Sequence, residues 1–168
     1  DEAYALDPKD SGKDFGAESI STLIKAMEDK RQELCVILTG YQQPMQDLLK
    51  SNCGFNSRIQ FKLYFKDYTP EELYKIFKKM VKDDKYKLDK NLKPLLIEHF
   101  KQAQKQDDFG NARYVRSMLE KIKMAQAQRV AEDTTADIDL IKVADIATVI
   151  NYLDEERPKE KIKIGFTT

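Results

Sequence analysis

The sequence predicts an α/β segment followed by a small bundle of helices. Residues 34–38 are apolar without alternation, which is typical of a strand in the middle of a parallel sheet. Further along the chain, four apolar stripes recur at helical spacing. Such a change of period along one chain indicates two packed parts. We expect an α/β domain over residues 1–67, a helical domain over 68–155 and a charged tail with a short strand over 156–168.

The amino-acid composition limits the kinds of partner that the chain is expected to bind. The 168 residues hold 29 Lys and Arg against 29 Asp and Glu, so the net charge gives no reason to expect nucleic acid or an acidic membrane. No stretch approaches the roughly 20 apolar residues of a membrane span. Cys35 and Cys53 form no Cys-x-x-Cys pair, and a single histidine leaves no cluster for a metal site. We therefore expect a cytoplasmic protein that binds neither nucleic acid nor membrane.

The chain is expected to be a fragment. It starts on Asp1-Glu2 rather than Met, without the strand that should lead into this pair. The phosphate-binding pattern G-x-x-x-x-G-K-[ST] does not occur, and Gly12-Lys13-Asp14 lacks the hydroxyl. We expect this polypeptide alone to be inactive and to bind nucleotide weakly or not at all. A sheet cut before Asp1 should also expose an edge through which chains associate.

The first part of the chain alternates between helical and extended patterns. The spacing of Ile20, Leu23, Ile24 and Met27 puts one apolar face on a helix. From Ile59 onward, apolar residues alternate with polar ones, which predicts a strand with one buried face. The expected elements are a loop over 7–14, a helix over 15–31, a strand over 34–38, a short helix over 44–50, a turn over 51–54 and a strand over 59–65.

The second part reads as helices with short connectors. Thr69 can cap a helix, Pro70 suits its first position, and Glu72 completes a capping box. His99 lies on an apolar stripe and is expected to be a core residue with a satisfied ring. The four stripes span 73–81, 92–100, 115–122 and 146–153, with a brief extended piece over 138–141. Short amphipathic helices bury such stripes against one another, which makes a bundle.

Three groups of residues could carry chemistry. In metal-assisted phosphoryl transfer, one carboxylate of a pair such as Asp1 and Glu2 holds Mg²⁺ and the other orients the attacking water. Arg58, at the start of the strand over 59–65, could reach a developing phosphate charge. Arg113, in a first helical turn capped by Asn111, opposes the helix dipole unless it bends toward a phosphate. The alternative is a surface acidic pair and two solvated arginines without a role.

Taken in order, these residues resemble the second half of an AAA+ ATPase module. The resemblance covers nearly the whole chain and is closest to the subgroup of stage V sporulation protein K and the red-type Rubisco activases. The motifs that carry it are Asp1-Glu2, Lys13-Asp14-Phe15-Gly16, Val36-Ile37-Leu38-Thr39-Gly40-Tyr41, Ser57-Arg58, Asp67-Tyr68-Thr69-Pro70 and Gly110-Asn111-Ala112-Arg113. The implied fold is the C-terminal part of a P-loop AAA+ parallel sheet with flanking helices, followed by a helical lid.

The resemblance also implies roles for individual residues. Asp1 would be associated with Mg²⁺, and Glu2 would activate water for ATP hydrolysis. Arg58 would be an arginine finger for the next subunit, and Arg113 the sensor-2 arginine of the lid. The sensor-1 position would be filled by Thr39 or Tyr41. A finger that acts on a neighbour needs an assembly, so a homo-oligomeric ring, usually a hexamer, is implied.

The first hypothesis is therefore a fragment of an AAA+ ATPase, a ring that hydrolyses ATP to remodel an unknown client protein. The second is a non-catalytic helical module that binds a partner protein. Nucleic-acid binding through the lysine-rich stretch over 75–87 is a third and weaker hypothesis, because the net charge is zero.

Overall fold

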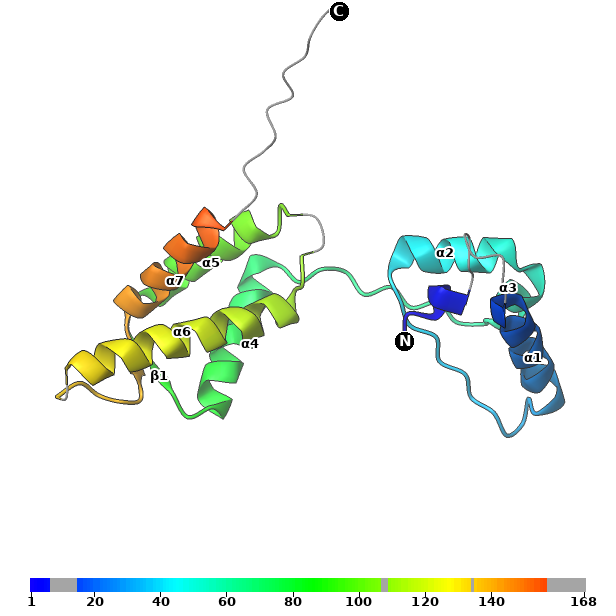
Figure 1. Cartoon of the computed structure of the whole chain (residues 1–168), viewed down its shortest axis with the longest axis horizontal. Helices are drawn as coiled ribbons and strands as arrows, with labels where there is room; N and C mark the ends of the chain where they lie inside the picture. The colour runs from blue at the N-terminus through cyan, green and yellow to red at the C-terminus, as the bar shows by residue number, and fades with distance from the viewer. Residues whose placement is uncertain (7–14, 107–108, 134, 157–168) are drawn as a thin grey trace, which may run out of the picture. The chain divides into compact units, whose positions relative to one another are not determined.

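The structure is a computed structural model that describes residues 1–6, 15–106, 109–133 and 135–156 (Figure 1). It is mostly helical, with a small two-stranded parallel sheet. The chain divides into two compact units, Asp1–Lys66 and Asp67–Thr168. We call them the N-terminal unit and the C-terminal unit and describe each by itself.

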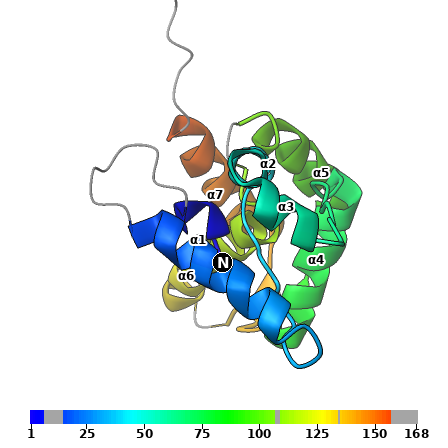
Figure 2. The same ribbon diagram turned by 90° about the vertical axis from the view of Figure 1, so that its right-hand side faces the viewer.

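The N-terminal unit is built from short helices. They are a 3₁₀ turn, η1 (Ala3–Leu6), and the helices α1 (Phe15–Asp29), α2 (Gln42–Ser51) and α3 (Cys53–Arg58). The turn η1 packs against α1 and α2, and α3 packs against the same two helices (Figure 2). Their shared core is small; its buried residues are Ala3, Ile20, Leu48 and Phe55.

The sequence predicted two of these helices and missed the third. The helices expected over 15–31 and 44–50 are confirmed as α1 and α2. The stretch 53–58 was expected to be a turn leading into a strand, and this is wrong. Asn52 ends α2 in an extended conformation, and its side chain accepts a hydrogen bond from the Phe55 amide, 3.1 Å away. This side-chain cap starts α3 at once.

The strands expected over 34–38 and 59–65 are also wrong. Neither stretch belongs to a helix or a strand in the structure. The expected buried face of the second stretch is open to solvent: Phe61 is 82% and Phe65 95% exposed. A strand is held by backbone hydrogen bonds to a neighbouring strand, and within the described residues only β1 and β2 of the other unit pair in this way.

The C-terminal unit contains the four predicted helices, which are confirmed. Its elements are α4 (Pro70–Asp83), β1 (Lys87–Leu88), α5 (Leu92–Ala103), α6 (Ala112–Glu132), β2 (Leu140–Ile141) and α7 (Val143–Glu155). The strand β2 falls in the predicted extended piece, whereas β1 was not predicted. The two strands pair in parallel, with Lys87 opposite Leu140 and Leu88 opposite Ile141.

The start of α4 shows how the sequence sets this fold. The Thr69 hydroxyl accepts from the Glu72 amide, and Glu72 Oε2 accepts from the Thr69 amide, 2.8 Å away. The predicted capping box is thus confirmed. The hydrogen bond from the Thr69 amide, and then that from its hydroxyl, holds the pKa of Glu72 below its ordinary value.

The four helices of the C-terminal unit enclose one core. Its fully covered residues include Leu73, Phe77, Leu96, Phe100, Val115, Leu119, Ile122, Ile141 and Ile146. His99 is buried beside this core, and its Nε2 atom lies 2.7 Å from the Tyr114 hydroxyl. The prediction of a core histidine with a satisfied ring is confirmed.

Some expectations fall outside the described residues, namely the loop over 7–14 and the tail strand around 162–166. Within the described residues, every helix is too short or too polar to cross a membrane.

Candidate functional site

The acidic pair lies beside the end of the 34–38 run. Thr39 Oγ1 donates a hydrogen bond to Asp1 Oδ1 over 2.7 Å. The Ala3 amide donates to the Thr39 carbonyl oxygen over 3.0 Å. Two segments almost forty positions apart in the sequence therefore meet here, and two predicted site residues, Asp1 and Thr39, are in direct contact. We call the group formed by Asp1, Glu2, Tyr4 and Thr39 the acidic corner.

Glu2 has an unusual backbone in this corner. Its φ angle is 50°, a region that few residues other than glycine adopt and that occurs often at functional sites. Partial burial, and next the negative charge of Glu2, raise the pKa of Tyr4.

Gly40 allows the Tyr4 ring to lie in this position. A Cβ atom on Gly40 would come within 2.8 Å of the Tyr4 ring and 2.9 Å of the Met45 sulfur. Only glycine permits so close an approach. Tyr4 was not among the predicted site residues, and its one signal in the sequence is an aromatic residue two positions after the acidic pair.

The two candidates for the sensor-1 position differ in their contacts. Thr39 contacts Asp1 directly, as described above. Tyr41 is 61% exposed, and its ring centroid lies 6.4 Å from that of Tyr4. Tyr41 is therefore a neighbour of the acidic corner through Tyr4, whereas Thr39 belongs to it.

Arg58 forms its hydrogen bonds with residues outside the acidic corner, and the prediction that it starts a strand was wrong. It is the last residue of α3, not the first of a strand. Its Nη1 atom donates to the Gly54 carbonyl oxygen over 3.0 Å, and Nη2 donates to Glu28 Oε2 over 3.1 Å. Within the described residues, its buried Nε has no hydrogen-bond partner. The guanidinium is thus held by α1 and α3 and is 32% exposed.

Arg113 belongs to the C-terminal unit, and its convergence with Glu2 stays a prediction. It lies in the first turn of α6, a turn with no acidic residue, and it is exposed. Within the described part of the chain, no ion pair involves Arg113. A cation near a helix N-terminus costs a few tenths of a kcal/mol, so this position is unfavourable unless an anion approaches it.

The acidic corner fits a magnesium ion that is held partly by a nucleotide. Mg²⁺ usually takes one or two carboxylates and fills its other positions with water and substrate phosphates. Asp1 and Glu2 supply two carboxylates, and Thr39 fixes one oxygen of Asp1. Elsewhere in the described chain, no group of three or more His, Cys, Asp or Glu side chains is placed to hold a metal. The residues present therefore fit a shared site better than a closed protein site.

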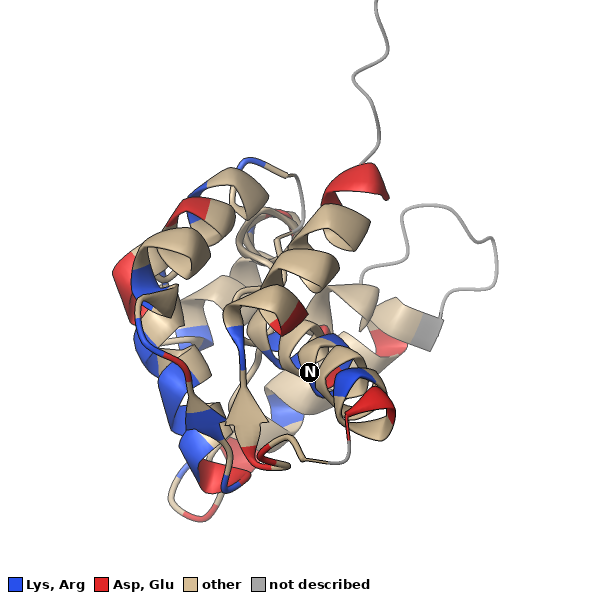
Figure 3. Cartoon of the chain, turned by 90° about the vertical axis from the view of Figure 1, so that its left-hand side faces the viewer, with Lys and Arg blue, Asp and Glu red and all other residues tan. Residues whose placement is uncertain are grey.

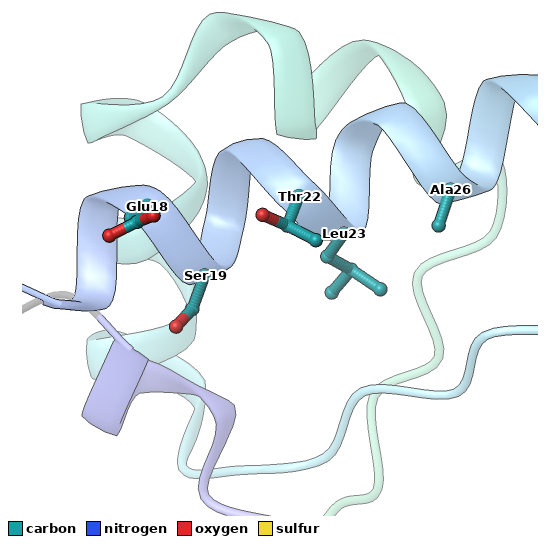
Figure 4. Close-up of a pocket in the computed structure, with 5 residues that line it drawn as sticks. All are labelled: Glu18, Ser19, Thr22, Leu23 and Ala26. Carbon is teal, nitrogen blue, oxygen red and sulfur yellow. The ribbon is translucent and has the colours of Figure 1, made fainter.

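A hollow of the N-terminal unit lies along α1 (Figure 4). It measures about 510 Å³ and is lined by Glu18, Ser19, Thr22, Leu23 and Ala26. Glu18 is the one ionisable group among these five residues, so the lining offers no cation for a phosphate. This hollow does not compete with the acidic corner as a nucleotide site.

Basic and acidic residues are interspersed along the helices (Figure 3). Two lysines of the predicted lysine-rich stretch are paired: Lys79 lies 2.9 Å from Asp83, and Lys87 lies 3.4 Å from Asp137. Mixed charges of this kind are typical of a solvated face rather than of a nucleic-acid surface.

Comparison with known proteins places the chain. Residues 69–156 match the family model of the AAA lid domain. A CfxQ homolog from Galdieria sulphuraria is 36% identical over 160 residues, which cover 92% of this chain and 52% of the relative. A chloroplastic ribulose bisphosphate carboxylase/oxygenase activase from Cyanidioschyzon merolae is 37% identical over 130 residues, 77% of this chain and 44% of the relative. The protein CbbX of Cereibacter sphaeroides is 36% identical over 139 residues, 83% of this chain and 45% of the relative.

The chain spans about half the length of the curated relatives that it matches. Their names support the activase side of the expected subgroup, and the sporulation side has no support. The lid model alone covers more than half of the chain. The chain therefore belongs to the AAA+ ATPase family, and residues 69–156 are its AAA lid domain.

Proposed function

We propose that this chain is part of a ring-forming motor, such as a hexamer, that hydrolyses ATP with Mg²⁺ and remodels a client protein. The observation that carries the proposal is the hydrogen bond from the Thr39 hydroxyl to the carboxylate of Asp1, the residue directly before Glu2. Bound Mg²⁺ and ATP would supply the phosphoryl group and the neutralisation of its charge.

The residues of the acidic corner divide the work. Asp1, whose carboxylate is oriented by Thr39, holds a water-bound magnesium ion. Glu2 orients the attacking water and takes its proton. Thr39 is our choice for the sensor-1 position because it contacts Asp1 and Tyr41 does not. Arg113 contacts the γ-phosphate from the lid.

Arg58 acts on the nucleotide of the neighbouring subunit. Its guanidinium is attached to Gly54 and Glu28 of its own chain, so it is presented from α3 in a defined direction. A delocalised cation of this type stabilises charge on a transferred phosphoryl group. Because the group it serves lies in another subunit, turnover depends on assembly.

The first test replaces Glu2 by Gln in the full-length protein. We expect ATP binding to persist and hydrolysis to fall by a factor of about 10² to 10⁴, the usual contribution of a general base. The matched control is Glu18→Gln, an exposed carboxylate on α1, which should hydrolyse ATP at the normal rate. Normal ATPase activity in the Glu2→Gln and Arg58→Ala variants would instead favour the non-catalytic interaction module.

The second test mixes two inactive variants. A Glu2→Gln subunit keeps Arg58, and an Arg58→Ala subunit keeps Glu2, so a mixed ring contains some interfaces with both groups. Random mixing at equal amounts should restore activity at about a quarter of the interfaces. No recovery on mixing, although both variants assemble, would contradict the assignment of Arg58 to the neighbour's site.

We also propose that the client is a ribulose bisphosphate carboxylase/oxygenase, because one relative is named as an activase of that enzyme. The test adds the full-length protein and ATP to an inactive form of the carboxylase and measures carbon dioxide fixation. Recovery should require Glu2. The cytoplasmic location stays a prediction, and the activase relative is named as chloroplastic.

A further inference from the structure

The side chain of Asn111 does not do what its position suggests. Asn111 is the N-cap residue of α6, but it makes no side-chain capping bond. Its Oδ1 atom accepts from the Tyr68 amide over 3.1 Å. Its Nδ2 atom donates to Asp67 Oδ1 over 2.7 Å and to the Phe109 carbonyl oxygen over 3.3 Å. The amide group thus holds the first two residues of the C-terminal unit and, through one further hydrogen bond, Phe109.

The backbone of Asn111 is strained to reach these partners. Its φ and ψ angles are 49° and −121°, a sparsely populated combination for a residue with a side chain. Such a conformation persists when surrounding contacts over-determine it. Gln104 adds a second contact, since its side-chain nitrogen donates to the Tyr68 carbonyl oxygen. Both polar groups of the Tyr68 backbone are therefore held by the C-terminal unit.

The same turn of α6 is anchored on its other side. The Tyr114 hydroxyl lies 2.7 Å from His99 Nε2 of α5, and the two rings stack with their centroids 5.9 Å apart. The backbone of Arg113 lies between these two anchors, Asn111 and Tyr114. Its side chain remains exposed. Arg113 consequently has a backbone held on both sides and an exposed side chain.

We propose that Asn111 is a positioning residue that connects Arg113 to the linker residues Asp67 and Tyr68. A movement of the Arg113 side chain is thereby transmitted to the linker. The inference rests on the proposed role of Arg113 as the lid contact to the γ-phosphate. Asp67 and Tyr68 directly follow the last residue of the N-terminal unit. Without the Asn111 contacts, the lid would still fold and bind nucleotide, but movement of Arg113 would no longer turn the linker.

The first experiment needs neither nucleotide nor activity. Hydrogen exchange of the Tyr68 amide is measured by NMR in this chain and in its Asn111→Ala variant. The matched control is Asn91→Ala. Like Asn111, Asn91 is an N-cap residue with positive φ (67°) and no side-chain capping bond. We expect Tyr68 to exchange at least about tenfold faster in Asn111→Ala and unchanged in Asn91→Ala. Equal exchange in both variants would overturn the proposal.

The second experiment exchanges the amide of Asn111 and the carboxylate of Asp67 between the two positions in the full-length protein. Asn111→Asp places a carboxylate against Asp67, which breaks the contact by repulsion. Adding Asp67→Asn restores a donor and acceptor pair, while the contact to the Phe109 carbonyl remains lost. We expect Asn111→Asp to lower kcat about tenfold with KM for ATP within about twofold, the size of an ordinary coupling effect. The double variant should recover most of kcat.

The outcomes separate this inference from the proposed function. Arg113→Ala should weaken binding of a fluorescent ATP analogue, whereas Asn111→Asp should not. A defective Arg113→Ala together with a double variant no better than Asn111→Asp would overturn the coupling role alone. An Arg113→Ala variant with normal nucleotide affinity and turnover would overturn the proposed function, and this inference with it. A loss of kcat that follows a loss of folded protein would mark Asn111 as merely structural and would also overturn the proposal.

Discussion

The two units of the chain differ in how far their apolar side chains are buried. In the C-terminal unit, residues from four helices and β2 close one continuous core. In the N-terminal unit, four buried residues form the core. Seven of its large apolar or aromatic side chains are exposed: Leu34, Ile37, Tyr41, Phe61, Leu63, Tyr64 and Phe65.

The reason for this difference lies in backbone hydrogen bonding. A helix satisfies its own amide and carbonyl groups, so the C-terminal helices need each other only to bury their apolar stripes. A strand must find another strand. The stretches 34–38 and 59–65 of the N-terminal unit pair with no strand among the described residues, and most of their large apolar side chains are exposed.

The largest expected effect compares two phenylalanines, one from each unit. Phe100 is fully buried and Phe65 is 95% exposed. Phe100→Ala should lower the free energy of unfolding of the C-terminal unit by about 4 kcal/mol, the usual cost of deleting a buried ring. Phe65→Ala should change the free energy of unfolding of the N-terminal unit by less than about 0.5 kcal/mol. Urea denaturation measures both effects, followed by NMR signals of α6 for the C-terminal unit and of α1 for the N-terminal unit.

The same pair should behave in the opposite way in self-association. Phe65→Ala removes an exposed apolar side chain and should reduce concentration-dependent association of the chain in sedimentation. A chain that stays monomeric at all concentrations, with or without Phe65, would show that its exposed stretches do not act as an association edge.

A second comparison sets two arginine pairs against each other. In the C-terminal unit, Arg129 donates two hydrogen bonds to Asp145, which is 3% exposed, and one to the Leu140 carbonyl oxygen. Arg129→Ala would leave the buried carboxylate without its ion pair and with the Lys142 amide as a donor, and should lower the free energy of unfolding by about 3 kcal/mol. In the N-terminal unit, Glu28 is exposed where it meets Arg58. Glu28→Gln should lower the free energy of unfolding of the N-terminal unit by less than about 1 kcal/mol.

Chemical denaturation of the two variants and the parent chain tests this difference. Equal losses in both units would mean that burial does not distinguish the two pairs. A second control is Lys79→Ala, which removes an exposed i,i+4 pair with Asp83 and should be nearly neutral.

The helices were predictable because their signals are local. The capping box at Thr69 and the apolar spacing of α4, α5, α6 and α7 act within a few turns, so the sequence alone contained them. The run 34–38 has an equally clear pattern, but a strand depends on a partner that the pattern does not specify. The helix α3 was missed because Asn52 ends one helix and caps the next.

The site was predictable in part. Asp1 was named from the acidic pair, and Thr39, with Tyr41 as its alternative, from the family resemblance; the structure joins Asp1 and Thr39. Tyr4 was missed because its position depends on a close approach across Gly40 that no spacing rule describes. Asn111 was expected to cap α6 and is its N-cap residue, but its side chain makes no capping bond because Asp67 and Tyr68, more than forty residues earlier, compete for it.

A third prediction tests how tightly the acidic corner is packed. Gly40→Ala would place a methyl group 2.8 Å from the Tyr4 ring and should cost the N-terminal unit about 2 kcal/mol by overpacking. The matched control is Gly54→Ala, whose methyl group would meet its nearest atoms at 3.6 Å, an ordinary contact. Thermal unfolding followed by tyrosine fluorescence measures both variants. An equal effect of the two substitutions would show that Tyr4 is not fixed by Gly40.

The smallest expected effect concerns how helices begin in the two units. The helix α4 starts with a capping box, whereas α2 starts at Tyr41 without a side-chain cap. Thr69→Ala should therefore lower the free energy of unfolding of the C-terminal unit by about 1 kcal/mol. Tyr41→Ala removes no side-chain cap from α2. The hydrogen bond from the Thr69 amide lowers the pKa of Glu72 from 4.5.

A lowered pKa of a carboxyl group fixes the sign of its pH dependence. The stabilisation from Glu72 is complete above its unfolded pKa of 4.5 and is lost as the pH falls through the lower folded value. Glu72→Gln should thus destabilise the C-terminal unit more at pH 7 than at pH 3. The control Glu71→Gln changes an exposed neighbour in the same turn and should show no such difference. A Glu72→Gln penalty that is equal at both pH values would mean that the charge of the capping carboxylate contributes nothing, and that the box acts through geometry alone.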